Sequence, residues 1–223
     1  MWACRAHWGR LGGPVQYILL IILLGALGVG IVVLARLAWS HRRRRRKLAR
    51  FAHETDLRFS ADESFDLIGR YGDFVAVTAG HSPCVENVLS GRRGRWQFRV
   101  FDYHFEAGHG PGRVLRRYSM MIAETGVDLP DALLWHGDDL EQAPLAARYP
   151  SRRVGPWYVI DGADCAEILT DALSPLAGAP VSIQTRGRSV MLIRARPLRP
   201  AEAVGWVSAA AAAVAAAEEG LSA

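Results

Sequence analysis

Side chains that could do chemistry are concentrated between positions 81 and 109. The segment holds three histidines, three carboxylates and one cysteine: His81, Cys84, Glu86, Asp102, His104, Glu106 and His109. On an extended strand Asp102, His104 and Glu106 would share one face, because strand side chains alternate with a period of two. Imidazole, thiol and carboxylate groups on one surface suit metal binding or acid–base and nucleophilic catalysis.

A metal site here would use His81, Cys84 and His104 or His109 as ligands of a zinc-type ion. Their spacing matches neither CxxC nor HExxH, and the residues converge only if one particular strand pairing forms. We therefore predict no metal site and no cofactor. A membrane-anchored hydrolase or metal-binding enzyme that uses the 81–109 cluster is kept as the alternative.

A thiol nucleophile would be Cys84, with His104 as its base and Asp102 to orient that base. Asp102 and His104 lie two positions apart on one strand, however, so they can hardly point head to tail. We predict that Cys84 is a small buried apolar residue. Asp102 is expected to be hydrogen-bonded, or paired across the strands with an arginine such as Arg116 or Arg117. No catalytic residue is predicted.

Two turn segments near this cluster are arginine-rich or glycine-rich. Gly108-His-Gly-Pro-Gly112 lacks the Lys and Ser/Thr of a phosphate-binding loop and the helix that would follow it, so we interpret it as a hairpin turn. Arg92, Arg93 and Arg95 are typical of solvated turn charges, with contact to anionic headgroups or an acidic partner as the alternative.

The elements that must position these residues change character along the chain. Ser60 and Glu63 form a capping-box pattern that predicts a short helix. Four strands rich in Val, Phe, Tyr and Met are predicted at 74–78, 84–89, 96–106 and 115–123. Turn sequences between them favour an antiparallel meander.

The second half of the domain mixes helices and strands. We expect an irregular stretch from Leu129-Pro130 to Gly155, and a helix opened by the capping box Asp164–Glu167. The remaining expected elements are a strand at 157–160, a hairpin of 181–185 and 189–195 around Arg186-Gly187, and a final alanine-rich helix at 200–220. The predicted fold class is α+β, an antiparallel sheet with helices packed on one face.

A membrane anchor precedes this domain. Residues 11–35 carry no charge, and a bilayer needs roughly 20 apolar residues as a helix. We predict a short extracytoplasmic N-terminus at 1–13, a transmembrane helix at 14–38, a basic juxtamembrane helix at 39–56 and a cytoplasmic α+β domain at 57–223. A cleavable signal peptide is the weaker alternative, because its apolar region would be shorter.

Flanking charges predict the orientation of that helix. Two basic residues precede the helix and eight follow it within 15–20 positions of its ends. This excess places the C-terminal side in the cytoplasm, and the membrane is predicted to be the inner membrane of the cell. The topology signal is the run Arg42, Arg43, Arg44, Arg45, Arg46 and Lys47, which could also attract anionic lipid headgroups.

The distribution of charge and the spacing of the cysteines argue against two classes of protein, nucleic-acid-binding domains and disulfide-stabilised domains. Residues 1–50 hold 10 of the 27 basic and none of the 22 acidic side chains, which leaves 17 basic against 22 acidic in residues 51–223. An acidic domain argues against nucleic-acid binding. Three widely spaced cysteines, Cys4, Cys84 and Cys165, imply no disulfide framework.

Short motifs in the domain resemble those of a family of uncharacterised bacterial membrane-anchored proteins, found mostly in actinobacteria. They are Asn87-Val88-Leu89-Ser90-Gly91, the strand ending Phe101-Asp102-Tyr103, the Leu129-Pro130 step and the helix–hairpin–helix ending. The resemblance covers roughly residues 45–218 and departs at Phe105, where a second Tyr is expected. The resemblance implies a fold and a membrane topology, and it implies no catalytic residues for this chain.

Taken together, these patterns predict a single-pass membrane protein whose domain recruits or scaffolds a protein partner rather than acting as an enzyme. The expected partners are the lipid bilayer and an unknown protein, with no nucleic acid. Neither the partner's identity nor the oligomeric state follows from the sequence.

Overall fold

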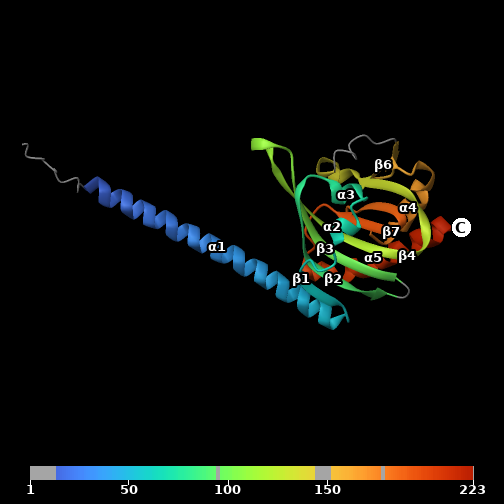
Figure 1. Ribbon diagram of the computed structural model, residues 1–223, viewed down its shortest axis with the longest axis horizontal. Helices are drawn as coiled ribbons and strands as arrows, with labels where there is room; N and C mark the ends of the chain where they lie inside the picture. The colour runs from blue at the N-terminus through green and yellow to red at the C-terminus, as the bar shows by residue number, and fades with distance from the viewer. Residues whose placement is uncertain (1–13, 94–95, 144–151, 177–178, 223) are drawn as a thin grey trace, which may run out of the picture. The chain divides into compact units, whose positions relative to one another are not determined.

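The computed structural model describes residues 14–93, 96–143, 152–176 and 179–222 (Figure 1). The described chain divides between Arg44 and Arg45 into two compact units. The first unit is apolar helix, and the second is an α+β domain built on one sheet of seven strands. This agrees with the predicted fold class.

Helix α1 runs without a break from Pro14 to Glu54. Its apolar part from Tyr17 onward has a mean hydropathy of 3.1 over an 18-residue window, none of which is buried by the protein. Among the described residues it is the one helix long and apolar enough to cross a membrane. The last turns of α1, from Arg45, belong to the domain, where Leu48, Phe51 and Ala52 are buried in its core.

The first part of the sheet is an antiparallel meander. Its strands are β1 (Arg58–Asp62), β2 (His81–Arg93), β3 (Trp96–Ala107) and the first half of β4 (Val114–His136), paired in that order. The 3-10 turn η1 (Gly110–Gly112) links β3 to β4, in the predicted hairpin turn. β2 contains two register shifts, between His81 and Cys84 and between Glu86 and Leu89.

The long strand β4 organises the rest of the sheet. β7 (Ser182–Arg194) pairs with β4 from Ser119 to Leu134, on the side away from β3. Beyond the end of β3, the strand β6 (Trp157–Asp161) pairs with the last residues of β4, and β5 (Arg152–Val154) pairs with β6. The β4–β7 register shifts twice, between Glu124 and Leu129 and between Leu129 and Ala132.

The sheet is covered on both faces. Helices α4 (Ala166–Ala172) and α5 (Pro200–Ser222) pack with the end of α1 over one face, which we call the first face. The short helices α2 (Leu67–Arg70) and α3 (Val75–Thr78) cover the second face. The 3-10 turns η2 (Gly137–Gln142), η4 (Ala163–Cys165) and η5 (Ser174–Leu176) connect these elements.

Alternation along the strands explains the two cores. In β3, Phe98 and Val100 enter the core of the first face, whereas Phe101, Tyr103 and Phe105 enter the core of the second. Large apolar side chains of β3 therefore enter both cores, although Arg99, Asp102 and His104 lie between them. The prediction of helices on one face only was therefore wrong.

Three expected elements differ from the structure. Residues 74–78 form a helical turn rather than a strand, because Phe74, Ala76 and Val77 bury against the core of the second face. A five-residue apolar run does not distinguish the two by its periodicity. Residues 129–136 continue β4 instead of forming an irregular stretch, while 144–151 lie outside the described residues. Pro130 is tolerated because it lies within the irregular β4–β7 pairing.

The predicted hairpin around Arg186-Gly187 is a single strand, β7. Gly187 has a φ of +52° and lies opposite Leu129, so the apparent turn is an irregularity against β4. Both predicted capping boxes were also wrong. Ser60 lies in β1, and the N-cap of α4 is Cys165, which forms no side-chain cap.

The other strands and helices predicted within the α+β domain are confirmed. α5 spans the predicted final helix, and its buried residues Val207, Ala210, Ala213, Val214 and Ala217 pack in the core of the first face. Alanine at three of these positions removes side-chain bulk and brings the helix close to its neighbours.

Candidate functional site: an arginine-lined pocket

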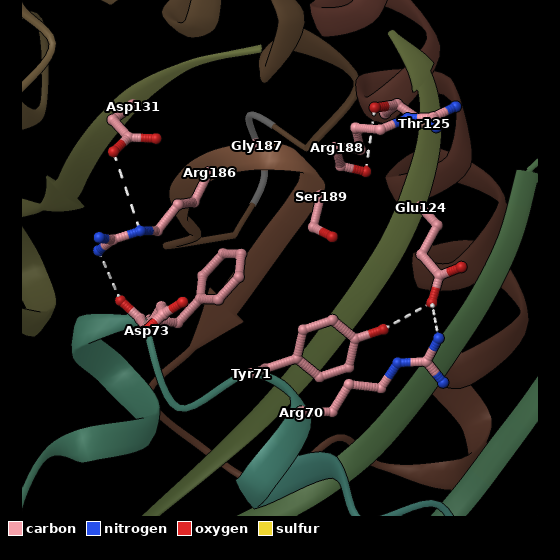
Figure 2. A pocket seen from close by; sticks show the side chains of 11 residues that line it. Arg70, Tyr71, Asp73, Glu124, Thr125, Asp131, Arg186, Gly187, Arg188 and Ser189 are labelled. Carbon is pink, nitrogen blue, oxygen red and sulfur yellow. Dashed lines mark hydrogen bonds and ion pairs between the residues drawn. The ribbon is translucent and has the colours of Figure 1, made fainter. Parts of the chain in front are cut away.

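A pocket of about 690 Å³ opens where the β4–β7 register is irregular (Figure 2). Its wall is formed by the end of α2 with the following turn, by β4 around Glu124, Thr125 and Asp131, and by β7 at residues 186–189. An irregular pair of strands turns side chains away from the regular sheet surface. The fold thus supplies both the opening and the polar groups that line it.

Glu124 is the hydrogen-bonding centre of one side of the pocket. Its Oε1 accepts a hydrogen bond from the Tyr71 hydroxyl at 2.8 Å and another from Nη1 of Arg99 at 3.1 Å. The same oxygen forms an ion pair with Nη2 of Arg70 at 3.4 Å. Arg99 is 4% exposed, whereas the side chain of Arg70 is 53% exposed. Arg99 therefore supports the wall from inside, and Arg70 faces the opening.

The environment shifts the pKa of both acid partners in this network. Burial raises the pKa of Glu124, but hydrogen bonds from Tyr71 and Arg99 and the charges of Arg70 and Arg99 outweigh it, so the net shift is downward. Burial and the neighbouring Glu124 raise the pKa of Tyr71 to about 12. At neutral pH the pair is a carboxylate that accepts from a phenol.

Two arginines line the opposite side. Arg186 donates from Nη1 to the carbonyl of Asp73 at 2.8 Å, and its Nε lies 3.8 Å from Oδ2 of Asp131. Arg188 donates to the carbonyl of Gly126 at 3.0 Å. Figure 2 shows Arg186 between Asp73 and Asp131, across the pocket from the pair Tyr71 and Glu124.

The pocket can bind an anion that reaches several guanidinium groups. Each guanidinium has five N–H donors in a planar fork, which suits carboxylate or phosphate oxygens. The ion pairs of Arg70 and Arg186 are long, at 3.4 and 3.8 Å, and half-exposed, so each is weak in water and exchangeable. An incoming acid could replace Glu124 or Asp131 as their partner.

The 81–109 cluster lies elsewhere in the fold, on β2, β3 and the turn after β3, and is in two parts. Cys84, Glu86 and His104 have ligand atoms within 4.8 Å of one another, because Cys84 lies opposite His104 in the sheet. His81 and His109 form a separate pair, with their Nε2 atoms 3.3 Å apart. The combination of His81, Cys84 and His104 is therefore not the one that converges.

The expectation that Asp102 is hydrogen-bonded is confirmed, because it accepts a hydrogen bond from Nδ2 of Asn87 at 2.7 Å. It lies opposite Ser119, whereas its alternative partners Arg116 and Arg117 lie opposite Phe105 and His104. Cys84 is partly exposed rather than buried. Glu106 pairs with Arg113 at 2.7 Å. In the preceding turn Arg92 is exposed, and Arg95 lies outside the described residues.

The predicted topology signal lies on α1. Arg42, Arg43, Arg46 and Lys47 are exposed, and Arg44 and Arg45 are partly buried. Arg45 lies 3.7 Å from carboxylate oxygens of both Asp62 and Glu86, so part of the run has a role within the domain. Its role at the membrane surface stays a prediction.

The sequence reading missed the pocket. Glu124 and Arg186 are far apart in the chain and line the same pocket only because β4 pairs with β7. One signal was available, because Arg186-Gly187-Arg188 interrupts the apolar runs 181–185 and 189–195 with charge. A charged interruption of this kind also predicts a turn between two strands, so it does not by itself indicate a pocket.

Comparison with known proteins supports the fold. No protein-family model matches the chain, and no curated protein is similar to it in sequence. The chain is similar in fold to the crystal structure of the mycobacterial trehalose monomycolate transport factor A, TtfA, with a TM-score of 0.53 and 12% sequence identity. The match covers 77% of this chain and 92% of that one. The mycobacterial source is compatible with the actinobacterial resemblance, which remains a prediction.

Proposed function

We propose that this chain is a single-pass inner-membrane protein whose cytoplasmic domain is a non-enzymatic accessory factor of a membrane transport system. The observation that carries the proposal is that a helix able to span a membrane ends in a domain with the fold of a transport factor. The cytoplasmic placement rests on the excess of basic residues after the span.

The pocket is the docking site in this proposal, and an acidic segment of a membrane-protein partner is its occupant. Arg70 and Arg186 have side chains that are 53% and 46% exposed, and their present acid partners are weakly held. A partner's carboxylates would gain bidentate, charge-assisted hydrogen bonds to these planar groups. The pocket arginines would then set the orientation and specificity of docking.

Docking is tested by site-specific photo-crosslinking of the full-length chain in its native membranes. The crosslinker replaces Ser189 on the pocket wall. We expect a crosslink to a polytopic membrane protein with an acidic cytoplasmic segment, lost in the double variant R186E/R188E. The matched control R58E/R92E reverses two exposed arginines outside the pocket and should keep the crosslink.

Two results would contradict the docking proposal: a crosslink to lipid alone, or a protein crosslink that survives R186E/R188E. The orientation has its own test, a reporter fused after Ala223. Activity of a cytoplasmic reporter is expected, and activity of an extracytoplasmic reporter would overturn the cytoplasmic placement.

A further inference from the structure

Cys84, Glu86 and His104 bring a thiol, a carboxylate and an imidazole together on the domain surface. Their ligand atoms all lie within 4.8 Å of one another, and all three residues are partly buried. We propose that these side chains bind a zinc-type divalent metal ion. This site is separate from the arginine-lined pocket, and the inference does not rest on the proposed function.

The strand pairing explains why these residues converge. Cys84 lies directly opposite His104, and Glu86 lies opposite Asp102 one step along the same face. The register of β2 shifts on both sides of the Cys84–Glu86 segment. Ser82 and Asn87, at those shifts, have φ values of 51° and 55°, which are rare for residues other than glycine. Such irregularities redirect side chains and favour functional sites.

A hydrogen bond holds the second irregularity in place. Asn87 is 5% exposed, and its Nδ2 donates to Oδ2 of Asp102 at 2.7 Å. Asp102 therefore anchors β2 beside Glu86 and acts as a support for the site rather than as a ligand.

The spacing fits a tetrahedral ion after small side-chain rotations. Zinc lies about 2.3 Å from thiolate sulfur and about 2.0–2.2 Å from imidazole nitrogen or carboxylate oxygen. Tetrahedral angles then place ligand atoms roughly 3.3–3.6 Å apart, a spacing that falls inside the 4.8 Å within which the three ligand atoms lie. Three protein ligands leave the fourth position for water.

The surrounding charges favour a cation. Burial and the carboxylates of Glu86, Glu63 and Asp62 raise the pKa of the Cys84 thiol. The same negative groups attract a divalent ion. The positive charge of a bound ion would lower the pKa of the Cys84 thiol, which the carboxylates raise. Binding converts Cys84 to a thiolate and releases its proton to solvent.

Arg45 competes for one of the ligands but has another partner. Its guanidinium lies 3.7 Å from a carboxylate oxygen of Glu86 and 3.7 Å from one of Asp62. When Glu86 binds the ion, Arg45 can keep its contact with Asp62. The Arg45 guanidinium therefore keeps a carboxylate partner, Asp62, when the metal ion binds.

The test is a cobalt(II) titration of the full-length chain, purified in detergent under reducing conditions. A Co²⁺–thiolate bond gives a charge-transfer absorption that oxygen and nitrogen ligands do not give. We expect this band to saturate at one equivalent and to disappear when zinc is added. Affinity should rise with pH, because binding releases the Cys84 proton.

Variants assign the ligands. C84A should remove the charge-transfer band, and H104Q should weaken binding by at least about tenfold, as E86Q should to a smaller degree. C4S and C165A change the other two cysteines and should leave the band unchanged. Circular dichroism identifies variants that fail to fold, and H104Q and E86Q provide independent tests if C84A does.

The alternative ligands are His81 and His109, whose Nε2 atoms at 3.3 Å are spaced as two imidazoles on one ion would be. Binding that survives C84A and is lost in H81A/H109A would overturn the assignment to Cys84. The absence of the charge-transfer band in the folded full-length chain would also overturn it.

Discussion

The carboxylate of Glu218 accepts the backbone N–H of Gly126 at 3.0 Å and so connects the last helix to β4 beside the pocket. Glu218 is 1% exposed, and its other oxygen accepts the indole N–H of Trp96 on β3. Glu124 and Thr125, next to Gly126 along β4, line the pocket. One buried acid on the first face therefore helps to fix the geometry of a site on the second.

The first prediction concerns this acid. Glu218→Ala leaves two donors without their acceptor and should lower the free energy of unfolding by about 2–3 kcal/mol. Glu218→Gln keeps one acceptor oxygen and should cost less. Urea unfolding of the full-length chain in detergent measures both, with tryptophan fluorescence as the signal. Glu167→Ala removes an exposed acid of α4 and serves as the control. Equal stability of E218A and E167A would contradict the role assigned to Glu218.

The second prediction is the pH dependence that Glu124 imposes. Its pKa is lower in the folded than in the unfolded protein, because the Tyr71 and Arg99 hydrogen bonds outweigh burial. Its contribution to stability is therefore complete above about pH 4.5, its ordinary value, and is lost as the pH falls through the folded pKa. Unfolding measured from pH 7 to pH 3 should show a shallower acid decline in E124Q and, less strongly, in Y71F. Parallel curves for wild type and E124Q would be inconsistent with this network.

The parts of the fold that could be read from the sequence are those with local signals. The apolar segment of α1 has length and hydropathy, α5 has Pro200 and an alanine-rich pattern, and β3 has alternating large residues. The strand predicted at 115–123 is shorter than β4, because Gly126 and Pro130 are residue types that local signals associate with turns. Only its pairing with β7 shows that both residues are tolerated within a strand.

The candidate sites depend on long-range pairing, which one sequence does not show. Cys84 and His104 were recognised as chemically suitable, but the register that places them opposite each other arises from the shifts in β2. Glu124 and Arg186 come to line one pocket through the β4–β7 pairing. No spacing rule links residues brought together in this way.

The third prediction tests a close backbone approach at the end of β6. Gly162 has a φ of +72°, and a Cβ there would lie 2.7 Å from Cα of Ala132 and 2.9 Å from the carbonyl oxygen of Asp131. Gly162→Ala should cost about 1–3 kcal/mol from overpacking, in addition to about 1–2 kcal/mol for the left-handed backbone. Gly110, with a φ of +59° and nothing within 4 Å of a Cβ, is the matched control. Thermal unfolding should separate G162A from G110A, and equal losses would show that the strand relaxes to admit the methyl group.

The last prediction concerns orientation in the membrane. The positive-inside rule compares eight basic residues after the span with two before it. Substituting Gln for Arg42, Arg43, Arg44 and Arg46 leaves four against two, while retaining Arg45 and its contacts with Asp62 and Glu86. We expect part of the population to invert, because the charge difference that holds the C-terminal side in the cytoplasm is reduced.

Reporter fusions after Ala223, one active in the cytoplasm and one active outside it, measure the two populations of that variant. A control with four domain arginines replaced by Gln, Arg58, Arg92, Arg117 and Arg153, makes the same change in net charge far from the span in sequence. It should keep a uniform orientation, because charges beyond about 15–20 residues of the span contribute little. Uniform orientation of both variants would show that the run is not the topology signal. Attraction to anionic headgroups, worth about 1 kcal/mol per residue, would then be its remaining role at the membrane.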